Sequence, residues 1–142
     1  MYNKILVPVD GSKSSQKTIA HAAEIASKLG AEVTLLHVIP PLPSAIQGRG
    51  YASSIVEEIQ KHGSELLEQT KQEFMEFNSG VAVNTEMVYG DPAAEILQKA
   101  KNGGYDIIII GSRGLNELAG FIMGSVSKRV VRHAPCPVLV VR

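Results

Sequence analysis

Residues 106–125, DIIIIGSRGLNELAGFIMGS, join a run of four isoleucines to a loop rich in glycine. An uninterrupted apolar run of this length predicts a strand that is buried on both faces of a sheet. The loop contains four glycines within fourteen residues, at Gly111, Gly114, Gly120 and Gly124. Glycine loses more backbone entropy on folding than any other residue, so such a cluster indicates that something approaches the backbone closely. We therefore expect a central strand that ends at a ligand-binding loop.

Strands and helices alternate along the sequence on both sides of this stretch. Apolar runs predict strands at residues 4–10, 31–39, 81–90, 105–110 and 137–142. Apolar residues at helical spacing predict helices at residues 12–29, 53–78, 92–101 and over much of 116–133. Asp91 is expected to be an N-cap, because Pro92 follows it at the first helical position. The alternation predicts an α/β fold in which helices cover both faces of an open, five-stranded parallel sheet.

The composition of the strands predicts their order in the sheet. The four isoleucines and residues 5–7, ILV, are apolar throughout, which is typical of central strands. Residues 81–90 alternate, with Asn84 and Glu86 on one face, which is typical of an edge. The order 3-2-1-4-5 satisfies this pattern and the right-handed crossover rule. Its winding reverses between strands 1 and 4, and ligands of open α/β sheets bind beyond the carboxyl ends of the strands at such a point.

Composition and charge limit the class of protein. A chain of 142 residues with 44% hydrophobic and 20% charged residues is typical of one globular domain, expected to span residues 1–142. Fourteen basic and fourteen acidic side chains cancel, which argues against attraction to nucleic acid or to an anionic membrane. No apolar run suits a secretion signal or a membrane span. The single cysteine, Cys136, excludes an internal disulfide, so we expect a cytoplasmic protein.

The end of the glycine loop is chemically suited to an anion. The residues after Ser125 are expected to be helical, and a helix N-terminus has free N–H groups and a partial positive charge. Gly124 would admit the anion, and the hydroxyls of Ser125 and Ser127 would add donors. Gly111 and Gly114 would open the backbone beneath a second part of the ligand. The alternative is that the glycines only shape turns and Ser125 is an ordinary N-cap, but four glycines at the switch point favour phosphate binding.

The sequence lacks the common phosphate motifs G-x-x-x-x-G-K-[ST] and G-x-G-x-x-G. It resembles instead the nucleotide-binding members of the universal stress protein family. Three stretches carry the resemblance: ILVPVDGSKSS (5–15), LLHVI (35–39) and GSRGLNELAGFIMGSVSKRVVRHAPCPVLVV (111–141). The third contains the family's ATP-binding signature, G-x2-G-x9-G-[ST], at every required position. The resemblance implies an adenine-nucleotide-binding fold with five parallel strands and a homodimer.

The resemblance also implies a site. Pro8, Val9 and Asp10 would line the adenosine, with Asp10 near the ribose or the metal–phosphate end, and the backbone of Val38 would contact the adenine edge. The ribose and phosphates would be held by Gly111, Ser112, Arg113, Gly114, Gly124, Ser125, Val126 and Ser127. The implied ligand is ATP, or ADP or AMP, with Mg²⁺ or Mn²⁺ whose protein ligands stay open. Asp10 could instead cap the following helix, and Arg113 could be an exposed side chain without a role.

Three functions remain open at this point. The first is an ATP-binding universal stress protein with a regulatory role that depends on nucleotide occupancy. The second is a slow ATPase or phosphotransferase, although the sequence shows no dedicated catalytic set. The third is an interaction scaffold without nucleotide, against which the intact signature argues. The four histidines have no metal-ligand spacing, and His37 is expected to be a hydrogen-bonded structural residue.

The last predicted strand, residues 137–142, bears on assembly. In the order 3-2-1-4-5 it lies at an edge, where unpaired backbone groups and apolar side chains need a cover. A second copy of the same strand, running antiparallel across a two-fold axis, would supply one. We therefore expect a homodimer joined through residues 137–142. The alternative is a monomer whose edge is shielded by the preceding helix and by Arg142.

Overall fold

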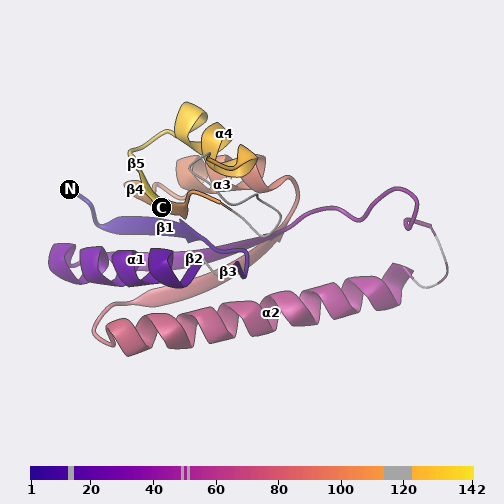
Figure 1. The fold of residues 1–142 in the computed structure, drawn as a ribbon, viewed down its shortest axis with the longest axis horizontal. Coiled ribbons are helices and arrows are strands. Elements are labelled where there is room, and N and C mark those ends of the chain that lie inside the picture. The colour runs from indigo at the N-terminus through magenta and orange to yellow at the C-terminus, as the bar shows by residue number, and fades with distance from the viewer. Residues whose placement is uncertain (13–14, 49, 51, 114–122) are drawn as a thin grey trace.

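The computed structural model describes residues 1–12, 15–48, 50, 52–113 and 123–142 (Figure 1). Within these ranges the strands are β1 (Lys4–Pro8), β2 (Glu32–Ile39), β3 (Val83–Tyr89), β4 (Ile107–Gly111) and β5 (Val138–Val141). The helices are α1 (Ser15–Leu29), α2 (Ala52–Phe77), α3 (Pro92–Asn102) and α4 (Ser125–His133). The strands are all parallel and lie in the order β3-β2-β1-β4-β5, which confirms the predicted fold and strand order.

Helices cover both faces of the sheet, α1 and α2 on one and α3 and α4 on the other (Figure 1). Side chains alternate between the faces along each strand. In β4, Ile109 packs into the core beneath α1 and α2, whereas Ile108 and Ile110 pack into the core beneath α3 and α4. All three are at most 5% exposed. This two-sided burial explains why the strand is apolar at every position.

The ends of the first two elements differ from the prediction. The first strand was expected to reach residue 10 and ends at Pro8. The helix was expected from residue 12: Ser12 is not helical, α1 is described from Ser15, and residues 13–14 lie outside the described residues. Proline has no N–H to donate to a ladder, so the strand can continue only weakly past it. Beyond Pro8 only one further rung forms, from the Val9 N–H to the Leu36 carbonyl at 2.8 Å. The chain then turns away from the sheet.

The later elements follow the sequence more closely. Asp91 is the N-cap of α3, as expected: its side chain accepts a hydrogen bond from the Ala94 N–H at 3.0 Å, and Pro92 occupies the first turn. The helix expected over much of residues 116–133 is helical from Ser125, and residues 123–124 before it are not. The part of this prediction at residues 116–122 lies outside the described residues. No helix in the described ranges has the length and apolar character needed to cross a membrane.

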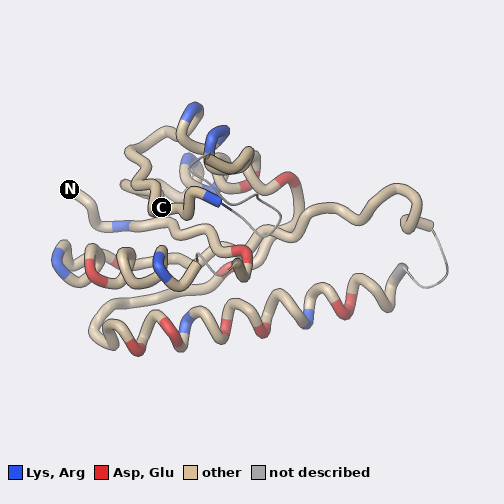
Figure 2. The backbone as a smooth tube through the Cα atoms, in the orientation of Figure 1, with Lys and Arg blue, Asp and Glu red and all other residues tan. Residues whose placement is uncertain are grey.

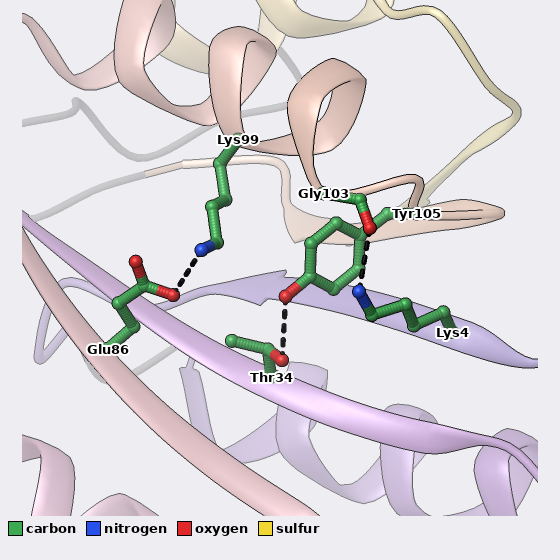
Figure 3. Close-up of polar contacts among 6 residues, drawn as sticks. All are labelled: Lys4, Thr34, Glu86, Lys99, Gly103 and Tyr105. Carbon is green, nitrogen blue, oxygen red and sulfur yellow. Dashed lines mark hydrogen bonds and ion pairs between the residues drawn. The ribbon is translucent and has the colours of Figure 1, made fainter.

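Polar groups at the amino end of the sheet pair with one another (Figure 3). The Tyr105 hydroxyl donates to the Thr34 hydroxyl at 2.8 Å, and both residues are buried. The Lys4 ammonium donates to the Gly103 carbonyl at 2.6 Å and lies 4.6 Å from the centre of the Tyr105 ring. Farther along the sheet, Lys99 on α3 forms an ion pair with Glu86 on β3, which is level with Leu36 of β2 and so not at the amino end. This pair partly covers the polar face of the edge strand.

Candidate functional site

A cavity of about 390 Å³ opens beyond the carboxyl ends of β1 and β4. These two strands are neighbours in the sheet, and the winding direction reverses between them. The cavity therefore lies at the switch point where the sequence placed a ligand. Ten residues of the predicted site line it: Pro8, Val9, Asp10, Val38, Gly111, Arg113, Gly124, Ser125, Val126 and Ser127.

Two residues of the predicted site remain outside this lining. Ser112 contributes through its backbone to the loop beside the cavity, since its N–H donates to the Val141 carbonyl at 2.8 Å. Its carbonyl accepts from the Gly124 N–H at 2.7 Å. These two bonds join the end of β4 to β5 and to the start of α4. Gly114 lies outside the described residues.

The N-terminus of α4 opens onto the cavity. Gly124 is its N-cap, in an extended conformation, and the helix begins at Ser125, so Ser125 is not the N-cap. The Gly124 carbonyl accepts the first helical bond, from the Lys128 N–H at 3.0 Å. A glycine N-cap offers no side-chain acceptor, so the first turn of α4 has no side-chain cap from Gly124. Such a turn is suited to an anion.

The hydroxyl of Ser127 links the first turn of α4 to β4. Ser127 lines the cavity but is only 4% exposed, and its hydroxyl donates to the Gly111 carbonyl at 2.6 Å. This bond ties the first turn of α4 to the end of β4. The side chain therefore positions the helix, and its expected role as a phosphate donor stays a prediction.

Asp10 stands where the chain leaves β1. Its Oδ1 accepts a hydrogen bond from the Ser12 N–H at 2.9 Å, which closes a tight turn. The first helical residue of α1, Ser15, donates its N–H to the Ser12 carbonyl at 3.0 Å. Asp10 therefore shapes the turn that precedes α1. It is the one acidic side chain among the described lining residues.

His37 fixes the end of β1, as a hydrogen-bonded structural residue was expected to do. Its Nδ1–H donates to the Val9 carbonyl at 2.9 Å. In a continuing parallel ladder, that carbonyl would accept from the Val38 N–H. The Leu36 carbonyl faces β1, where it accepts from the Val9 N–H. The Ile39 carbonyl faces the other neighbour of β2, which is β3, and accepts from the Gly90 N–H that follows that strand. Because backbone groups alternate sides along a strand, those of Val38 point to the side where β1 has ended.

The other side of the cavity is mostly apolar and was not predicted. Its further lining residues include Leu36, Pro40, Pro92, Ile96 and Ile110. Pro92 and Ile96 lie four residues apart on α3, which begins beyond the carboxyl end of β3. The sequence marked Pro92 only as a helix start. The sequence did contain one indication that Pro92 borders the site: it follows the end of a predicted strand. Ser12, Ser15 and Thr18 line the cavity from the α1 side and were also missed.

The cavity has one polar end and one apolar part, called here the apolar slot. Arg113 and the first turn of α4 lie at the polar end, and the carboxyl end of β2 and the first turns of α3 form the slot. Within the described ranges, no three His, Cys, Asp or Glu side chains gather closely enough to hold a metal. The cavity lining therefore combines a polar part with an apolar part.

The sequence profile of the universal stress protein family matches residues 1–142. The chain belongs to the universal stress protein family. Universal stress protein YxiE from Bacillus subtilis is 38% identical over 150 aligned residues, which cover 100% of both chains. Among solved structures, the universal stress protein UspA from Lactobacillus plantarum is 32% identical and covers 99% of this chain and 98% of its own, with a TM-score of 0.86.

A third relative in the universal stress protein family was solved with a ligand. It is a family member from Arabidopsis thaliana with AMP bound, 26% identical to this chain. The alignment covers 98% of this chain and 90% of the plant chain, with a TM-score of 0.72. The likeness therefore extends over nearly all of both chains.

Proposed function

We propose that this universal stress protein binds ATP and acts as a nucleotide-dependent regulator in a stress response. The observation that carries the proposal is the uncapped first turn of α4, which opens onto a cavity at the switch point of the sheet. The intact G-x2-G-x9-G-[ST] signature and the AMP bound to the Arabidopsis relative support it. We further propose a single cytoplasmic domain spanning residues 1–142.

The adenine would lie in the apolar slot, against the end of β2. The Val38 N–H would donate to the base, and the Val38 carbonyl would accept from its exocyclic amine. Both groups point to the side that β1 leaves open, because the Val9 carbonyl is already engaged by His37. Pro92 and Ile96 supply the apolar surface against which a flat ring can pack. This pairing selects adenine by the order of one donor and one acceptor.

The phosphates would lie at the first turn of α4. There the N–H groups of residues 125–127 and the guanidinium of Arg113 surround the polar end of the cavity. Hydrogen bonds to charged oxygens each contribute roughly 1.5–3 kcal/mol, which must offset the ordering of a flexible ligand. We expect a dissociation constant for ATP on the order of micromolar, which corresponds to a binding free energy of about −8 kcal/mol.

The remaining polar lining residues have oxygen atoms that suit a divalent cation. The Asp10 carboxylate would repel a polyphosphate unless a cation lay between them, and Ser12 and Ser15 lie beside it on the lining. Carboxylate and hydroxyl oxygens suit Mg²⁺ or Mn²⁺, which also takes phosphate oxygens as ligands. We therefore propose that ATP binds with Mg²⁺ or Mn²⁺ at the Asp10 end of the site.

Assembly as a homodimer belongs to the same proposal. β5 is an edge strand, and Val138, Leu139 and Val140 remain partly exposed. An antiparallel copy of residues 137–142 would cover these side chains and pair the free edge. Light scattering at tens of micromolar should give the mass of a dimer, and Val140→Lys should shift it toward the monomer while the fold persists. A monomer mass for the unmodified protein would contradict this part.

Calorimetry with Mg-ATP tests the proposed function directly. We expect saturable heat with ATP, and mass spectrometry of the denatured protein should detect an adenine nucleotide that co-purified with it. The absence of heat and of competition at millimolar ATP would overturn the nucleotide proposal. Turnover measured on the same sample separates a regulator, for which we expect slow or no hydrolysis, from an ATPase.

A further inference from the structure

An ion pair joins the two helices whose first turns border the cavity. Arg129 on α4 donates from its Nη1 to Asp91 Oδ2, the N-cap of α3, at 2.8 Å. The same Asp91 oxygen accepts from the Ala94 N–H at 3.0 Å. Of the three ion pairs found among the described residues, this is the one that connects α4 to the start of α3.

The two residues touch elements that serve different parts of the ligand. Pro92, next to Asp91, lines the apolar slot together with Ile96 on the following turn. Arg129 lies one turn after Ser125, which lines the polar end. Neither Asp91 nor Arg129 lines the cavity. The pair therefore connects the base wall, defined as the first turns of α3, to the phosphate wall, defined as the first turn of α4.

The other hydrogen bonds that hold the phosphate wall go to the end of β4 and not to α3. The Ser127 hydroxyl bonds to Gly111, and the Gly124 N–H bonds to Ser112, so both contacts tie α4 to the end of β4. Asp91 holds α4 from the α3 side. Asp91 is also poised for this contact: the Ala94 N–H, and then Arg129, keep the pKa of its carboxyl below the ordinary value.

We infer, on the basis of the proposed function, that Asp91 and Arg129 are positioning residues that set the spacing between the base wall and the phosphate wall. A fixed spacing favours a ligand that contacts both walls, because binding at one wall then presents the second part of the ligand at the other. A ligand that contacts one wall gains nothing from it. The pair thus raises affinity for ATP without touching ATP.

The test compares ligands and charges. Asp91→Asn keeps an acceptor for the Ala94 N–H but removes the negative charge, and Arg129→Gln removes the positive charge. Both side chains are about half exposed, at 54% and 53%, so the effect is modest. We expect each variant to weaken ATP binding about three- to five-fold, less at high salt, and the double variant to be no weaker than either single one. Adenosine and pyrophosphate should bind as before.

A charge effect without positioning gives a different result. If only the field at the phosphates mattered, Arg129→Gln would weaken ATP binding, but Asp91→Asn would strengthen it. Effects of opposite sign, or equal losses for ATP and adenosine, would therefore overturn the inference. Arg132→Gln is the matched control, since it removes a cation one turn further along α4 from a residue with no ion pair in the described structure.

Amide hydrogen exchange without nucleotide separates this inference from the proposed function. The Lys128 N–H is bonded to the Gly124 carbonyl in the first turn of α4. We expect its exchange to accelerate several-fold in Asp91→Asn and in Arg129→Gln but not in Arg132→Gln. Unchanged exchange in the first two would overturn the role of the pair. A protein that binds no ATP but shows the accelerated exchange would overturn the proposed function and retain the pair as the link between the walls.

Discussion

The two ends of the sheet use polar residues in opposite ways. At the amino end, Tyr105 bonds to Thr34 and Lys4 bonds to Gly103, so protein groups satisfy one another (Figure 3). At the carboxyl end, Asp10 and the first turn of α4 face a cavity of about 390 Å³. The same strands connect the two ends. One end is closed by internal hydrogen bonds, and the other presents polar groups to the cavity.

The difference shows where the molecule can change without unfolding. Removing a partner at the amino end leaves a buried polar group without a hydrogen bond, which destabilises the fold. A change at the cavity alters groups that a ligand would satisfy, so it should affect binding more than stability. Charge is also unevenly distributed, since Lys and Arg gather on α4 while Asp and Glu predominate along α2 (Figure 2). The helix rich in Lys and Arg, α4, is therefore the one that begins where the phosphates are proposed to bind.

The largest expected effect is at Gly124. Its backbone, with φ −64° and ψ 161°, can be adopted by other residues, so Gly124→Val should lower stability less than it lowers ATP affinity, because its side chain enters the space proposed for a phosphate. We expect ATP affinity to fall roughly 100-fold, about 2.7 kcal/mol, with adenosine affinity nearly unchanged. Calorimetry with both ligands measures this, and equal losses for the two would show that the loop does not hold the phosphates.

A smaller effect is expected at Tyr105, where a substitution should lower stability and leave ATP affinity unchanged. Tyr105→Phe leaves the buried Thr34 hydroxyl without its donor, so denaturant unfolding should show a loss of about 1–2 kcal/mol. The double variant with Thr34→Val should recover part of this loss, because both polar groups are then removed. ATP affinity should not change in either variant. A change in affinity would mean that the two ends are not independent.

The smallest effect is the pH dependence of Asp91. The pKa of its carboxyl is lowered, mainly by the Ala94 N–H and then by Arg129, so its contribution to stability is present above pH 3.8 and is lost as pH falls through the lower folded pKa. Exposure keeps this below about 1 kcal/mol. We expect the difference in thermal midpoint between the unmodified protein and Asp91→Asn to shrink from pH 7 to pH 3. A constant difference would contradict the ion pair in solution.

The sequence predicted the sheet because burial of strands leaves a direct pattern. Four isoleucines in succession, all β-branched, favour a strand packed on both faces, and that strand lies inside the sheet. The end of β1 could not be predicted in the same way. Residues 9 and 10 look like strand residues, but the Val9 carbonyl bonds to a histidine that is 28 residues away, and this contact depends on the register of β2.

The cavity was predicted on its glycine side and missed on its apolar side for a related reason. Gly111 and Gly124 stand out because their lack of side chains is visible in the sequence. Ile96 looks like any buried helix residue, and only the path of α3 over the sheet brings it to the cavity. The bond from the Ser127 hydroxyl to the Gly111 carbonyl could not be predicted either, because the sequence does not show that the two groups face each other.

The bond between His37 and the Val9 carbonyl also has a consequence for how this site tolerates mutation. If the main chain of Val38 reads the base, nearly any side chain that suits a strand can replace valine there, because the recognising atoms are common to all residues. Sequence drift at position 38 would then be neutral for ligand choice. The vulnerable position is its neighbour: without the imidazole, the Val9 carbonyl is free to accept from Val38 and extend the sheet by one rung into the slot. Specificity for the base would thus be encoded one residue away from the groups that express it.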